Sequence, residues 1–160
     1  MSKVINILFC GTGGQGVLKA AEVTGVAAMC AGFHVKKSEV HGMAQRGGSV
    51  ESHLRFGQQV FSPLVPKGGA DILLPFHSGE EERLRGFLKP GGLNLLPFLG
   101  RAHEKGVERM FLNTYMVGVL AGHLELGREF WMQALEQEFR AKKLAENINV
   151  FLAGFGEVGA

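Results

Sequence analysis

The sequence predicts an α/β fold, a three-layer α/β/α arrangement around a mixed, largely parallel sheet. An apolar run at residues 4–10 leads into the glycine-rich segment Gly11–Gly16. An Ala- and Leu-rich stretch at residues 17–31 follows and stops at Gly32. A buried strand, a tight loop and a helix in this order are typical of a Rossmann-like start. At 160 residues the chain has the length of a single domain, and we expect residues 1–160 to form one.

The next segments indicate that the sheet is mixed. Residues 49–56 alternate between mostly apolar and charged side chains, which predicts a half-exposed strand whose charged face, including His53 and Arg55, is open to solvent or lies at an interface. Gly57 and the two glutamines after it predict a hairpin into Val60 and Phe61. Because a hairpin joins antiparallel strands, we do not expect a wholly parallel sheet.

The remaining segments predict strands alternating with helices. Ser78, with Glu81 three residues later, matches a capping box and predicts a helix at 79–88, followed by a turn at 89–92. The other predicted elements are strands at 33–35, 71–76, 93–96 and 109–112, and helices at 114–126 (capped by Asn113), 128–142 and 144–153.

The composition disfavours several classes of protein. A net charge of +2 with no basic stripe argues against a nucleic-acid partner. No apolar run approaches the roughly 18 residues of a membrane span, and the first residues do not resemble a signal peptide. We therefore expect a cytoplasmic protein without a membrane partner. The two cysteines, Cys10 and Cys30, are too few for an iron–sulfur cluster, which takes about four thiolates. We expect no metal site and no catalytic residue in this chain.

The first candidate site is the loop Gly11-Thr12-Gly13-Gly14-Gln15-Gly16, which has the G-x-G-x-x-G pattern between a strand and a helix. Backbone N–H groups at such a helix start can hold a phosphate. The acidic residue expected about 20 positions later in NAD sites is absent, and Lys36 and Lys37 stand there instead. NAD is therefore disfavoured, whereas NADP and coenzyme A stay open. A purely structural role of these glycines in a tight turn also stays open.

The second candidate site is the polar segment from Ser38 to Ser49. It places Glu39, His41, Gln45 and Arg46 among glycines and between two strands. By strand order this segment lies near the carboxyl end of the sheet, beside the glycine loop, where open α/β folds bind ligands. Arg46 could form a fork with a carboxylate or phosphate, or pair with Glu39.

These two motifs together resemble the gamma subunit or domain of 2-oxoacid:ferredoxin oxidoreductases. The matching pattern is Gly11-x-Gly13-Gly14-Gln15-Gly16 followed by Glu39-x-His41-Gly42-Met43-Ala44-Gln45-Arg46-Gly47-Gly48-Ser49-Val50. Within this family, the second motif is most similar to the beta subunit of the indolepyruvate type.

The resemblance implies a role in the oxidative decarboxylation of a 2-oxo acid to an acyl-CoA, with electrons passed to ferredoxin. Thiamine diphosphate, magnesium and iron–sulfur clusters would lie in partner subunits, and contact with ferredoxin would be indirect. This chain would be inactive alone and without a tightly bound cofactor, and its loop Gly11–Gly16 would hold a phosphate of coenzyme A or pack against the partner. Its partner-facing loop would comprise His41, Gly42, Met43, Gln45, Arg46, Gly47, Gly48 and Ser49. The alternatives are a stand-alone regulatory protein that binds NADP or a nucleotide, and a purely structural assembly subunit.

Overall fold

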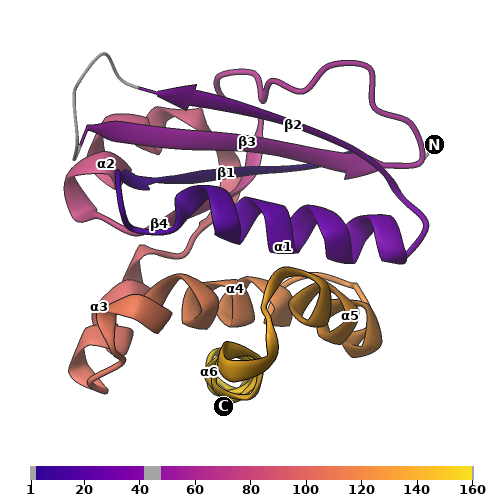
Figure 1. Cartoon of the computed structure of the whole chain (residues 1–160). Helices are drawn as coiled ribbons and strands as arrows, with labels where there is room; N and C mark the ends of the chain where they lie inside the picture. The colour runs from indigo at the N-terminus through magenta and orange to yellow at the C-terminus, as the bar shows by residue number, and fades with distance from the viewer. Residues whose placement is uncertain (1–2, 42–47, 160) are drawn as a thin grey trace.

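The structure, a computed structural model, describes residues 3–41 and 48–159. The elements in chain order are β1 (Ile5–Thr12), α1 (Val17–Cys30), β2 (His34–His41), β3 (Ser49–Gly57), β4 (Ala70–Pro75), α2 (Ser78–Leu84), the 3₁₀ turn η1 (Arg85–Phe87), β5 (Leu88–Asn94), α3 (Leu96–Glu104), the 3₁₀ turn η2 (Arg109–Phe111), α4 (Leu112–Gly122), α5 (Arg128–Glu138) and α6 (Ala141–Gly156) (Figure 1). No helix of the described ranges is both long and apolar enough to cross a bilayer.

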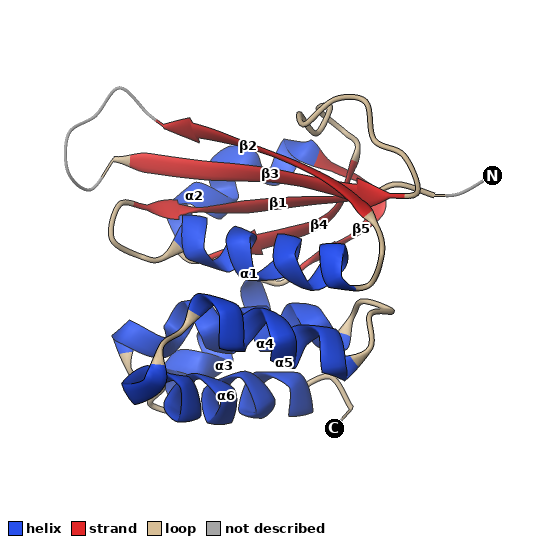
Figure 2. Cartoon of the chain, turned by 45° about the vertical axis from the view of Figure 1, so that its right-hand side comes forward, coloured by secondary structure: helices blue, strands red, loops and turns tan. Residues whose placement is uncertain are grey.

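The described strands form one mixed sheet in the order β2-β3-β1-β4-β5 (Figure 2). β4 runs parallel to both of its neighbours, β1 and β5. β3 runs antiparallel to both of its neighbours, β1 and β2. Only β3 therefore opposes the common direction, which confirms the predicted mixed, largely parallel α/β sheet.

The predicted hairpin after Gly57 is wrong. β3 pairs with the strand before it, β2, from His34 opposite Gly57 to His41 opposite Val50. Residues 58–69 form no strand and cross back over the sheet. Side chains hold this crossing segment, because the Val60 N–H donates to Nδ1 of His34 and Arg55 Nη1 donates to the carbonyl of Ser62.

The sheet is covered very unequally on its two faces. On β1, Ile7 and Phe9 point into the larger core with α1, whereas Leu8 and Cys10 point into a small core under α2. Beyond α1 lie α4, α5 and α6, so this side of the sheet is several helices thick (Figure 1). The opposite face is covered by α2, η1 and the crossing segment.

The helices beyond α1 pack closely through glycines. A Cβ on Gly118 of α4 would overlap the carbonyl of Phe151 in α6, and a Cβ on Gly154 would overlap the carbonyl of Tyr115. Each glycine thus allows the opposing backbone to approach. This close contact between α4 and α6 positions the C-terminal helix against the core.

Several predicted element boundaries are wrong. Residues 109–111 form η2, not a strand, and α4 begins at Leu112, so Asn113 lies in its first turn rather than at its cap. Residues 89–92 belong to β5, where Gly91 adopts a left-handed φ of 77° at an irregularity in the ladder. α3 was not predicted at all. The last two helices meet at residues 139–140, where the backbone is extended.

The predicted capping box at Ser78 is also wrong. The cap residue of α2 is His77, whose Nδ1 accepts a hydrogen bond of 3.1 Å from the N–H of Gly79. Ser78 is the first helical residue. Glu81 instead points to Arg85 and Asn94, so its carboxylate serves tertiary contacts rather than the helix start.

Candidate functional site

The glycine loop follows β1, at the point in the sheet where the connecting helices change from one face to the other. β1 and β4 are parallel neighbours, and the helix after β1 covers one face of the sheet while the helix after β4 covers the other. In open α/β sheets, the crevice at the carboxyl ends of two such strands is the usual ligand site. The two candidate loops can therefore be examined as parts of one region.

Gln15 fills this crevice with its own side chain. Its Oε1 accepts a hydrogen bond of 2.7 Å from the N–H of Thr12, and its Nε2 donates one of 2.8 Å to the carbonyl of Phe76. The amide thus joins the loop after β1 to the loop after β4. A Cβ on Gly11 would lie 2.8 Å from Oε1 of Gln15, so Gly11 leaves room for this bridge. A ligand must therefore lie to one side of Gln15.

Two other glycines are required by the turn itself. Gly14 and Gly16 adopt left-handed φ values of 88° and 78°, which disfavour any other residue. Asn113 presses against Gly16 and donates from Nδ2 to its carbonyl at 3.3 Å. The structural explanation thus accounts for much of the glycine pattern. It leaves the N–H groups of Gly14 and Gly16 without an acceptor among the described residues.

An open groove of about 340 Å³ lies on the α1 side of the glycine loop. It is lined by Thr12, Gly13, Gly14, Gly16, Val17, Leu18, Lys19, His41 and Val50. Lys19 is the cation of this lining; its Nζ lies 3.3 Å from Oε1 of Glu138 and 5.4 Å from the ring centroid of Phe139. The groove thus combines a helix N-terminus, an apolar wall and the partly exposed side chain of Lys19, whose ammonium group is paired with Glu138.

The described ends of the polar segment reach this groove, which confirms that the two loops are neighbours. His41 ends β2 and lines the groove, and the carbonyl of Gly48 accepts a 3.0 Å hydrogen bond from the N–H of Gly13. Ser49 begins β3 opposite Thr12. The candidates Gly42, Met43, Gln45, Arg46 and Gly47 fall outside the described residues.

A second hollow, of about 400 Å³, lies on the other side of Gln15. It is lined by Gln15, Phe76, His77, Ser78, Leu96, Leu99, Gly100 and His103. None of the other lining residues was predicted as a site residue, because half of them belong to α3, which the sequence analysis did not predict. Pro97 at the start of that helix was the available signal, since proline is favoured in a first helical turn.

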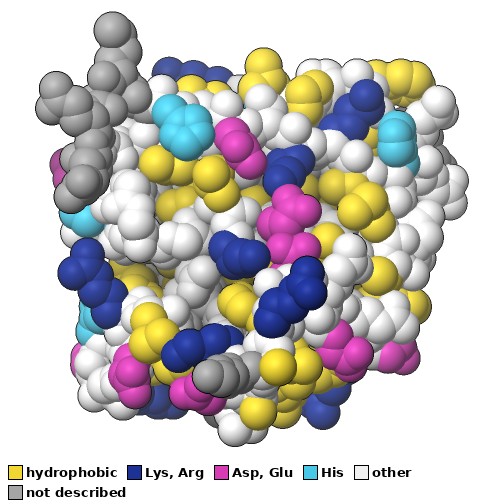
Figure 3. Space-filling model, viewed as in Figure 1, with side chains coloured by type: hydrophobic (Ala, Val, Ile, Leu, Met, Phe, Trp, Pro, Cys, Tyr) yellow, Lys and Arg dark blue, Asp and Glu magenta, His cyan; other side chains and the backbone are white. Residues whose placement is uncertain are grey.

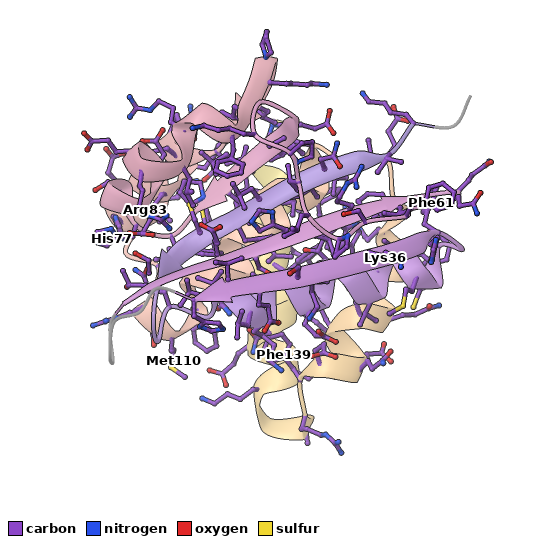
Figure 4. The ribbon with its side chains drawn as sticks, turned by 90° about the horizontal axis from the view of Figure 1, so that it is seen from above. Lys36, Phe61, His77, Arg83, Met110 and Phe139 are labelled. Carbon is purple, nitrogen blue, oxygen red and sulfur yellow. The ribbon has the colours of Figure 1, made fainter. Side chains whose placement is uncertain are left out.

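An ionic network lies under α2, on the face of β3 that was predicted to contact solvent or an interface. Glu51 and His53 are buried, 8% and 3% exposed, so that prediction is wrong. Arg83 donates from Nη2 to Glu51 at 3.2 Å and to Glu80 at 2.8 Å. The second oxygen of Glu80 accepts from the Ser49 hydroxyl at 2.9 Å. The network thereby ties α2 to the start of β3, next to the polar loop; Figure 4 labels Arg83 and His77 on this side of the molecule.

His53 connects the same network to the crossing segment. Its Nδ1 accepts a 3.1 Å hydrogen bond from the N–H of Val65, so the proton is on Nε2, which lies 3.1 Å from Glu51. The hydrogen bond from His53, helped by Arg83, holds the pKa of Glu51 below its usual range although burial opposes this. Both contacts depend on the ionised carboxylate.

The cysteines are not arranged to share a ligand. Burial, with a contribution from nearby Glu80, raises the pKa of Cys10 to about 12, so its thiol stays protonated and unreactive. Cys10 lies in β1 next to the glycine loop, whereas Cys30 is the last residue of α1, at the other end of that helix. Among residues 3–41 and 48–159, no group of three His, Cys, Asp or Glu residues is placed to hold a metal ion.

Comparison with known proteins identifies sequence relatives. The chain is 50% identical over 91 residues to "Indolepyruvate oxidoreductase subunit IorB" of Thermococcus kodakarensis, covering 57% of this chain and 45% of that protein. It is 28% identical to "Ketoisovalerate oxidoreductase subunit VorA" of Methanothermobacter marburgensis, over 91% of this chain and 34% of that protein. The chain thus spans less than half the length of these curated relatives.

Solved structures share the fold, and a family profile matches the sequence. The keto/oxoacid ferredoxin oxidoreductase gamma subunit of Geobacter sulfurreducens superimposes with a TM-score of 0.79 at 19% identity, covering 98% of this chain and 97% of that one. The 2-oxoglutarate:ferredoxin oxidoreductase of Magnetococcus marinus gives 0.80 at 19% identity, covering 98% and 31%. Residues 6–97, which include both candidate loops, match the profile described as pyruvate ferredoxin/flavodoxin oxidoreductase. The chain belongs to this family.

Proposed function

We propose that this chain is the subunit of a 2-oxoacid:ferredoxin oxidoreductase that holds coenzyme A beside the active site of a partner chain. The observation that carries the proposal is the groove in which the N-terminus of α1, the N–H groups of the glycine loop and Lys19 converge. A phosphate favours this combination, because N–H dipoles and an ammonium group attract the same anion. The Magnetococcus marinus structure was solved with 2-oxoglutarate, coenzyme A and succinyl-CoA bound, which supports the ligand class.

The groove fits part of coenzyme A in a specific way. The N–H groups of Gly14 and Gly16 would donate to a phosphate, and Lys19 would add its charge. Val17, Leu18 and Val50 form an apolar wall for an uncharged portion of the ligand. When bound, coenzyme A supplies the thiol that accepts the acyl group. This chain would bind and orient the cofactor rather than break a bond.

The polar segment would face the partner chain. His41, at one described end, lines the groove, and Ser49, at the other, pairs with Thr12 of the groove lining. We propose that His41–Ser49 reaches the partner's active site and that Arg46 binds a carboxylate or phosphate there. The relatives' names favour indolepyruvate as the substrate class.

The redox cofactors would belong to the partners. Cys10 is a buried, protonated thiol, and Cys30 lies at the other end of α1, so these two residues do not fit an iron–sulfur cluster. We propose that thiamine diphosphate, magnesium and the clusters lie in companion chains of the same complex. Ferredoxin would then receive electrons from those chains.

Replacement of Lys19 tests the site. In the assembled complex, we expect Lys19→Ala to weaken coenzyme A binding about tenfold, measured by calorimetry, since an exposed phosphate contact contributes on the order of 1 kcal/mol. Lys36→Ala, on β2 and outside the groove, is the matched control and should leave binding unchanged.

Two outcomes would reject the proposal. Unchanged coenzyme A affinity in Lys19→Ala, with an intact complex, would remove the groove from the binding site. Retention of NADP by the isolated chain through gel filtration, without coenzyme A binding in any complex, would instead favour a regulatory nucleotide-binding protein.

A further inference from the structure

The outer edge of β2 is unpaired in the described part of the chain. β2 is the first strand of the sheet order, and its principal contacts are with β3 on one side and α1 below. Figure 2 shows it as the border strand, with no helix beside its outer edge. A border strand of eight residues presents a row of free N–H and C=O groups to which a further strand can pair.

The side chains of β2 alternate between the two faces of the sheet. Those on the α1 face include Lys37 and Glu39, which lie 3.5 Å apart, and Lys37 also pairs with Glu22 of α1. Figure 3 shows acidic and basic side chains interleaved across the middle of this face of the molecule. On the other face, Lys36 and Val40 stand on either side of Ser38.

This sequence is self-complementary in one register. Residues directly opposite each other in an antiparallel pair share a face, so a two-fold axis between two copies of β2 must pass through a residue, not between residues. With the axis at Ser38, Lys37 of each copy lies opposite Glu39 of the other. With the axis at Lys37 or at Glu39, two like charges face each other, which destabilises a strand pair.

The same register brings exposed apolar groups together. Val40, 42% exposed, would lie opposite Lys36 of the second copy and diagonal to its His34. The ring of His34 holds the N–H of Val60, and the next residue, Phe61, is 83% exposed. Figure 4 shows Phe61 and Lys36 toward the same end of β2. The apolar Val40 of one copy would thus approach Phe61 of the other.

We propose that two copies of this chain pair antiparallel through the outer edges of β2, about an axis at Ser38, to form one continuous sheet. His41 would lie opposite Val35 of the second copy, so the two grooves lie at opposite ends of the paired strands and stay open. The inference does not depend on what the groove binds.

A cysteine at the axis tests the register directly. In the full-length chain carrying Cys30→Ser, the variant Ser38→Cys should form a disulfide-linked dimer on mild oxidation. Directly opposite Cα atoms lie about 4.5–5.5 Å apart, within the range that a disulfide spans. Lys36→Cys is the control, because in this register it is offset from its copy by four residues, about 13 Å, and should not form the disulfide-linked dimer.

Charge reversal tests the proposed pairs independently. Lys37→Glu should raise the dimer dissociation constant about tenfold, measured by analytical ultracentrifugation, because it places like charges opposite each other twice. Glu22→Gln removes only the partner of Lys37 on α1 and should leave the dimer intact. Lys37→Glu combined with Glu39→Lys should restore most of the affinity.

Three results would overturn the inference. They are a monomer at all concentrations with no Ser38→Cys cross-link, equal cross-linking of Ser38→Cys and Lys36→Cys, and protection of β2 amides from exchange only when a different chain of the complex is present. The last result would assign the edge to that chain.

Discussion

On the α1 side of the sheet the buried contacts are almost all apolar, whereas on the α2 side buried carboxylates and a histidine stand beside a small apolar cluster. Trp131, Tyr115 and Phe151 are among the largest fully buried side chains, and all lie on the α1 side. The α2 side instead depends on Glu51, Glu80 and their contacts with Arg83.

The two sides of the sheet thus contribute to the fold in different ways. Apolar burial is non-directional and contributes most of the free energy of folding. Hydrogen bonds are directional: here Ser49 donates to Glu80 of α2, and His53 of β3, which also contacts Glu51, accepts from Val65 of the crossing segment. Variants on the α1 side should therefore change global stability, whereas variants on the α2 side should change pH dependence and the order of the loops.

The largest effect is expected from Phe151→Ala. Phe151 is fully buried in α6, with its ring centroid 5.7 Å from that of Trp131 and 6.2 Å from that of Phe155. Its removal leaves a cavity and should lower the free energy of unfolding by about 3–5 kcal/mol. Urea unfolding measures the change. Leu152→Ala, at the exposed neighbouring position, is the control, and an equal loss there would contradict the comparison.

A smaller, pH-dependent effect is expected from Arg83→Met. It leaves Glu51 and Glu80 without their shared cation and should cost about 1–3 kcal/mol at pH 7. Because Glu51 has a lowered pKa in the folded protein, its contribution is present above the unfolded pKa and is lost as pH falls through the folded pKa. The difference from the parent protein should shrink below about pH 4.5.

Urea unfolding of both proteins between pH 7 and pH 3.5 measures this dependence. Arg109→Met, an exposed arginine of η2, controls for loss of a charge alone. A stability difference that is constant over this range would show that the carboxylates are not coupled to Arg83.

The smallest effect is expected at the boundary of the two sides, from Gln15→Ala. The variant loses two hydrogen bonds to backbone groups, those with Thr12 and Phe76, and should cost about 1–2 kcal/mol. Amide exchange in residues 11–16 should accelerate more than exchange in α6. Gln133→Ala on the exposed face of α5 should change neither quantity; uniform acceleration through the chain would refute a local role.

Local signals made β1, the glycine turn and α1 predictable. The apolar run of β1, the glycine loop and the helix to Gly32 are contiguous, and each was correct because its conformation depends on neighbours in sequence. The neighbouring position of the two loops followed from strand order alone. The glycines at 14 and 16 proved necessary because of left-handed φ values, which the pattern does not separate from ligand contact.

The features that depend on contacts between distant parts of the sequence were not predicted. The strand predicted from the alternation of residues 49–56 was correct. Its charged face is buried, however, because residues 58–69 and α2 cover it. No pattern within the strand itself indicates that these segments pack on it. The capping box failed because His77, not Ser78, accepts from the helix start. α3 is only nine residues long, and the helical spacing of its buried residues Leu99 and Ala102 was overlooked, so the hollow that it forms with His77 and Gln15 was missed.

The most direct test of the proposed function is amide exchange of the assembled complex with and without coenzyme A. The groove predicts slower exchange at residues 12–19 when coenzyme A is added, with little change in α5 or α6. Unchanged exchange at residues 12–19, in a complex that still converts coenzyme A to an acyl-CoA, would contradict the assignment of this groove.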